Sequence, residues 1–145
     1  MPINSPAKKP SRAYLRALHT PVRVELGPLS NSARVSICYS ELAWRKAAPA
    51  GSLNKYDKYC ETPAEIWRFS TDKLVLVCFD MEKLEPLSLD RAAGLMAHEA
   101  THVAQQIAKF IAEEGPLSEE VQAYVVQWVT SACWFHLPRD RIRKK

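Results

Sequence analysis

The chain has 145 residues, of which 47% are hydrophobic and 25% are charged, and its formal net charge is +4. These values predict one globular domain with a single core. No uncharged apolar run reaches the roughly 18 residues that a membrane helix needs, and the first residues lack the apolar core of a signal peptide. We therefore expect a soluble, cytoplasmic protein with no membrane partner.

The positive charge is concentrated at the two ends of the chain. Residues 1–16 contain four lysines and arginines and no acid, residues 137–145 contain five such cations and one aspartate, and the part between them has a net charge of −4. We therefore expect a basic N-terminal arm with a short helix (1–20), a single domain (21–136) and a basic tail (137–145). Such ends are suited to docking onto a larger protein assembly, and nucleic acid is a weaker candidate partner.

The first helix and the first two strands are predicted close to the N-terminus. Ser11 is placed to cap a short helix over residues 11–18. Apolar and polar residues alternate over 22–26 and again over 35–39, and a turn-rich segment separates the two runs. This spacing predicts an antiparallel pair of strands.

Two further strands are predicted after a long irregular segment. Residues 47–63 include prolines, a glycine and an asparagine, which predict either a wall of a functional cleft or a surface loop packed by its own tyrosines. Residues 65–69 predict a strand. The continuous apolar run over 74–79 is typical of a central strand that is covered on both faces, so we expect it to form the core of the sheet.

The pattern His-Glu-x-x-His occurs inside a predicted helix that begins at Ser88 or Asp90 and continues to about residue 113. On a helix, His98 and His102 stand one above the other, so both imidazoles can bind one zinc ion. Glu99 lies beside them, where its carboxylate can act as a general base on water. The alternative is a buried helix whose histidines are satisfied by hydrogen bonds.

A second helix is predicted after a break at residues 115–116, with Ser118 as its cap and its end near residue 135. An apolar stripe on this helix is expected to enter the core. Glu120 and Tyr124 lie on a face at the edge of that stripe. The Tyr124 hydroxyl is placed to donate to a developing oxyanion, although packing is the usual role of an aromatic residue at this spacing.

The segment His98–His102 resembles the signature of the zincin metallopeptidases, whose active helix carries two histidine ligands and a catalytic glutamate. The metzincin subgroup is excluded, because Gln105 and Ala108 stand where that subgroup has a glycine and a third histidine. The gluzincin subgroup takes its third ligand from a glutamate on a following helix. The run Glu120–Tyr124 is similar to the Glu-x-x-Ala pattern of small gluzincin-like peptidases, including those encoded by phages and mobile elements.

The resemblance implies an α+β fold, a minimal zincin-like domain in which a small, mainly antiparallel sheet packs on the motif helix and the C-terminal helix. The zinc ligands that it implies are His98, His102 and Glu120. Glu119 and His136 are the other candidates for the third ligand, and Glu120 has a simpler alternative role in the helix dipole. With Glu99 as the base, the implied reaction is hydrolysis of peptide bonds by a zinc metalloendopeptidase.

Two other classes of protein remain open. The chain could be a structural or assembly protein, such as a virion component, that keeps a zincin fold and docks through its basic ends. It could also be a nucleic-acid-associated protease, whose binding would weaken with salt. The SprT-like members of that class use a downstream histidine as the third ligand, and only His136 could serve here.

Overall fold

The computed structural model describes residues 9–112 and 115–138, so residues 1–8 of the predicted arm and 139–145 of the predicted tail lie outside the described residues. The elements in chain order are α1 (Arg12–His19), β1 (Val22–Val24), the 3-10 turn η1 (Gly27–Leu29), β2 (Arg34–Cys38), α2 (Glu41–Ala47), β3 (Ala64–Phe69), β4 (Leu74–Phe79), α3 (Met81–Leu84), α4 (Leu89–Phe110) and α5 (Glu119–Phe135). Helices combine with one small sheet, and the predicted α+β class is confirmed.

The strands form one mixed sheet in the order β1-β2-β4-β3. β1 and β2 pair antiparallel, with Val24 opposite Val35, as their alternating patterns predict. β3 and β4 form a second antiparallel pair. β2 and β4 run parallel, which the sequence did not indicate, and the crossover between them contains α2 and the edge strand β3. The sheet is mainly antiparallel but has a parallel pair at its centre.

β4 is the centre of the hydrophobic core, and all six of its residues are buried, as predicted. Val75, Val77 and Phe79 belong to the larger core cluster, together with the buried residues of α4 and α5. The alternate residues of β4 belong to a second cluster, which includes the buried Trp44 of α2. Because side chains alternate along a strand, these two clusters occupy the two faces of the sheet.

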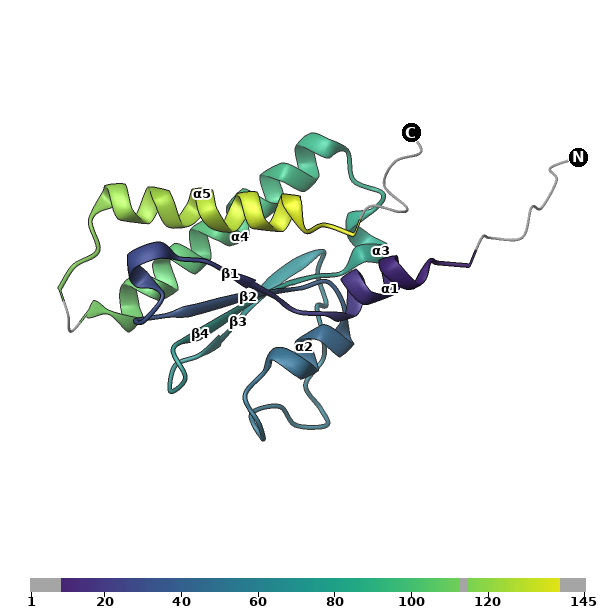
Figure 1. Ribbon diagram of the computed structural model, residues 1–145, viewed down its shortest axis with the longest axis horizontal. Helices are drawn as coiled ribbons and strands as arrows, with labels where there is room; N and C mark the ends of the chain where they lie inside the picture. Colours follow the sequence, from purple (N-terminus) through teal and green to yellow (C-terminus); the bar gives the residue numbers. More distant parts are fainter. Residues whose placement is uncertain (1–8, 113–114, 139–145) are drawn as a thin grey trace, which may run out of the picture.

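The two long helices pack against each other and cover one face of the sheet, whereas α2 lies on the other face (Figure 1). α4 contacts β3 and β4, and α5 contacts β1. The C-terminal half of α5 is tied to the sheet by the Tyr39 hydroxyl, which donates to the Cys133 carbonyl oxygen at 2.6 Å. The buried stripe of α5, predicted from sequence, includes Val125 and Val129.

Two short helices, α2 and α3, were not predicted. Each begins with a side-chain cap: the Ser40 hydroxyl accepts from the Ala43 amide at 3.2 Å, and the Asp80 carboxylate accepts from the Glu82 amide at 3.0 Å. Both helices are too short for an apolar period to stand out, so the caps were their clearest signal in the sequence. Among the described residues, no helix combines the length and the apolar content needed to cross a bilayer.

Candidate metal centre

α4 places the His-Glu-x-x-His motif at the boundary between the core and solvent. Its buried residues recur at helical spacing, among them Met96, Ala100 and Val103, and they face the sheet and α5. His98, two residues from Met96 and from Ala100, is exposed, and His102 is half-buried. The helix ends at Phe110, slightly before the predicted end near residue 113. The amphipathic pattern of α4 therefore turns the two imidazoles outward while its backbone is fixed by packing.

The two imidazoles lie close together with their Nε2 atoms 3.1 Å apart. The ring centroids are 4.6 Å apart and the ring planes are nearly perpendicular, at 85°. Two nitrogen ligands of one tetrahedral zinc ion, each at about 2.0–2.1 Å, stand about 3.4 Å apart. The pair is therefore close to the spacing that two histidine ligands of one zinc ion require.

Gln105 orients the imidazole of His102. Its side-chain oxygen lies 3.2 Å from His102 Nδ1. An Nδ1–H that donates to this oxygen leaves the lone pair of Nε2 free to bind a metal, which is the usual arrangement around histidine ligands. Sequence reasoning used Gln105 only to exclude the metzincins. Its position three residues after His102, on the same side of the helix, was the signal for this contact.

Glu99 is the one charged side chain that is buried among the described residues, with 6% of its surface exposed. Burial raises the pKa of its carboxyl group, while the neighbouring His98 and His102 lower that pKa and the charge of Glu65 raises it further. The pKa remains above its usual value. A carboxyl group in this setting can accept and return a proton within reach of the imidazole pair.

The structure does not bring the predicted third ligand to the histidines. Glu120 and Tyr124 are exposed, and the Tyr124 hydroxyl donates to Glu120 Oε1 at 3.5 Å. The Tyr124 ring stacks on Trp128. Within residues 9–112 and 115–138, no group of three histidine, cysteine, aspartate or glutamate side chains is arranged to hold one metal ion. Glu120 and Glu119 remain predictions as ligands, and His136 lies instead in a groove beside α1.

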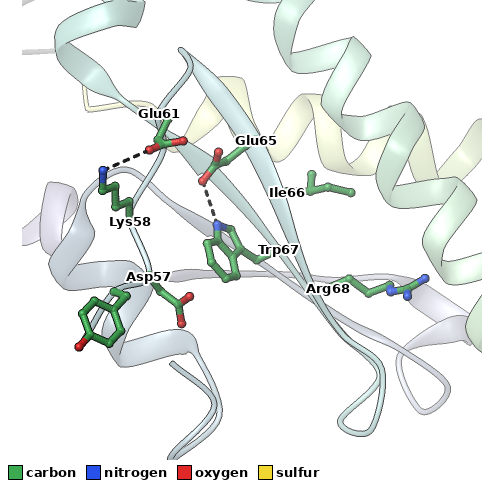
Figure 2. Close-up of a pocket in the computed structure, with 8 residues that line it drawn as sticks. Asp57, Lys58, Glu61, Glu65, Ile66, Trp67 and Arg68 are labelled. Atoms are coloured by element: carbon green, nitrogen blue, oxygen red, sulfur yellow. Dashed lines mark hydrogen bonds and ion pairs between the residues drawn. The ribbon is translucent and has the colours of Figure 1, made fainter. Parts of the chain in front are cut away.

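A pocket lies at the edge strand β3. Its volume is about 540 Å³, and it is lined by β3 and by residues 56–61 of the long irregular segment, which the sequence predicted as a possible cleft wall. Figure 2 shows Arg68 and Ile66 directed toward α4, with Trp67 and Glu65 facing the loop. Arg68 donates to the Gln106 side-chain oxygen at 3.0 Å, which joins the pocket wall to the motif helix.

The donor atoms present fit zinc in part. The histidine pair supplies two nitrogens at a suitable spacing, and the buried Glu99 supplies the proton acceptor that a hydrolytic site needs. Comparisons of the chain with known protein families, with curated proteins and with solved structures found no significant match. The chemistry of the site is therefore the basis on which function is inferred.

Proposed function

We propose that the chain is a zinc-dependent metallopeptidase that hydrolyses peptide bonds. The observation that carries this proposal is the 3.1 Å spacing of the His98 and His102 Nε2 atoms on the outward face of α4, next to the buried carboxyl group of Glu99. Two imidazoles satisfied by hydrogen bonds to each other and to Gln105 would not need a buried carboxyl group beside them, because burial of a carboxyl group is costly.

In this proposal His98 and His102 hold the zinc ion, and the resemblance to gluzincins assigns the third position to Glu120. When bound, zinc acts as a Lewis acid that polarises the peptide carbonyl and makes water more acidic. Glu99 takes a proton from the attacking water at its carboxylate and returns it to the leaving amine nitrogen. Its raised pKa supports this role, because a carboxyl group that holds the proton readily can also deliver it.

The open edge of β3 supports a peptide as the substrate. No described strand pairs with this edge, so its backbone groups are available to an extended chain. The adjacent pocket, of about 540 Å³, contains both cationic and anionic side chains. Arg68 connects it to α4 one turn beyond His102, through Gln106. A peptide that bound along β3 would therefore pass next to the motif helix.

The substitution Glu99→Gln tests the proposal. The amide keeps the size of the side chain but cannot accept a proton, so we expect zinc to be retained and hydrolysis to fall by about 10²–10⁴-fold. Zinc is measured by elemental analysis and cleavage by mass spectrometry of a peptide library. Glu82→Gln, an exposed position on α3, is the matched control and should leave both unchanged.

Two outcomes would contradict the peptidase. Equal cleavage by Glu99→Gln and the unchanged protein would assign the activity to a contaminant. Bound zinc without cleavage by either protein would favour the non-catalytic assembly protein, in which the motif helix serves structure alone.

A further inference from the structure

A second concave surface lies at the opposite side of the molecule from β3, between α1 and the C-terminal end of α5. It is a groove of about 520 Å³. In Figure 1, α1 (purple) lies near the yellow end of α5. The groove is lined by α1 on one side and by His136 on the other, with Thr20 and Val22 between them. Arg12 and Arg16 come from α1, and His136 follows α5 directly. The groove is separate from the histidine pair on α4.

The two arginines of the groove have no acidic partner among the described residues. Arg12 and Arg16 are one helical turn apart on α1, both are exposed, and neither forms an ion pair within the described part of the chain. Of the residues that the structure describes, none that lines the groove is acidic. α1 itself is held firmly, because its Ser11 cap accepts from the Tyr14 amide at 3.1 Å and the Tyr14 side chain is buried. The two arginines therefore extend from one well-packed helix into solvent, and no acidic group among the described residues neutralises them.

The rest of the groove has small apolar side chains, and an exposed aromatic ring lies beside it. Ala13, Ala17 and Val22 supply small apolar side chains between the cations. Next to His136 is Phe135, whose side chain is 76% exposed and whose ring meets the His136 ring edge-on at 4.9 Å. An aromatic ring this exposed is available for stacking, and its contact with the His136 ring places it beside the groove that His136 lines.

The sequence outside the groove has the same sign of charge. Lys8 and Lys9 precede α1, and the segment after residue 138 contains five cations and one acid. In the sequence, one basic segment precedes the groove residue Arg12 and the other follows the groove residue His136. Because the charges are alike, neither end is a suitable occupant of the groove. A polyanion is the ligand that complements it.

We propose that this groove binds single-stranded nucleic acid, with phosphates on Arg12 and Arg16 and a base stacked on Phe135. A row of cations beside an exposed aromatic ring is the combination that sequence-tolerant binding of single strands requires. An acidic peptide would use the two arginines but has no planar base to stack on the phenyl ring. The proposal is independent of the zinc site, and its test needs no peptidase activity.

The test measures binding of the full chain to a fluorescein-labelled oligothymidine of about 20 nucleotides, by fluorescence anisotropy over a range of salt concentrations. The double variant Arg12→Gln and Arg16→Gln should weaken binding by at least about tenfold and reduce the slope of log K against log salt by about 1.4, the loss of two phosphate contacts on a single strand. Phe135→Ala should weaken binding by about tenfold without changing the slope.

A charge-matched control separates the groove from general attraction. The double variant Arg34→Gln and Arg91→Gln removes two exposed arginines elsewhere on the surface and should leave affinity within about twofold. If it weakens binding as much as the groove variant does, the terminal segments and net charge bind the oligonucleotide, and the groove does not. Displacement of the oligonucleotide by polyglutamate would also overturn the proposal. So would binding to phosphatidylserine vesicles that is tighter than binding to the oligonucleotide and is unchanged by Phe135→Ala.

Discussion

α4 and α5 cover the same face of the sheet but place their polar groups differently. α4 buries a carboxyl group, Glu99, and turns two imidazoles outward in mutual contact. α5 keeps its carboxylates at the surface, where Glu120 accepts a hydrogen bond from Tyr124, one turn along the same helix. Its buried polar contact with the sheet uses a backbone carbonyl, that of Cys133. The groups of the proposed metal site are therefore concentrated on α4, and the buried contacts of α5 serve packing.

Of the variants that test this difference between α4 and α5, the double variant His98→Ala and His102→Ala should have the largest effect on zinc binding. We expect bound zinc to fall from about one ion per chain to none, because both nitrogen ligands are lost. Elemental analysis after dialysis against zinc measures this loss. In EDTA, the melting temperature of this variant should be nearly the same as that of the unchanged protein, since neither imidazole belongs to the buried core.

Val129→Ala on α5 is the matched control for that variant. Val129 is fully buried, so the substitution should lower the free energy of unfolding by about 2 kcal/mol and leave zinc binding intact. A histidine variant that still binds one zinc ion would exclude the pair as the metal site.

A pair of glutamate variants decides whether α5 takes part in metal binding. If Glu120 is the third ligand, as the resemblance implies, Glu120→Ala should raise the zinc dissociation constant by at least about 100-fold. Glu119→Ala should change it little, because consecutive helical residues point about 100° apart. Competition with a fluorescent zinc chelator measures both constants. The reverse order would make Glu119 the ligand, and no change in either would restrict the site to α4.

The smallest effect is expected from the residue that orients His102. Gln105→Ala removes the side-chain oxygen at His102 Nδ1, and we expect zinc affinity to fall by about tenfold. Gln127→Ala, at an exposed position of α5, is the matched control and should leave affinity unchanged. The same chelator competition detects the difference. Equal affinities would show that the imidazole is oriented by the helix alone.

Much of the fold could be predicted from local patterns. Ser11 and Ser118 cap their helices as expected, with their hydroxyls accepting from Tyr14 and Val121 amides. The strands follow from alternation, and the burial of β4 follows from its unbroken apolar run. The parallel pairing of β2 with β4 could not be predicted in this way, because it joins segments separated by about 40 residues and no local pattern specifies a partner strand.

The candidate site was predictable where it depends on one helix and not where it depends on two. The four-residue spacing of His98 and His102 fixes their proximity once α4 forms. The position of Glu120 depends on where α4 ends, on the connection after it and on the packing of α5. The groove beside α1 could not be predicted from the sequence either, because Arg12 and His136 come together only through tertiary packing.

The contact between the Tyr39 hydroxyl and the Cys133 carbonyl joins residues 94 positions apart in the chain. Synthesis on the ribosome delivers Tyr39 long before its acceptor, so this hydrogen bond forms only after most of the chain has emerged. The side of β1 that α5 contacts in the folded protein is not covered by α5 during that interval. Completion of the core therefore waits for the last helix, although the strands that it covers are made first.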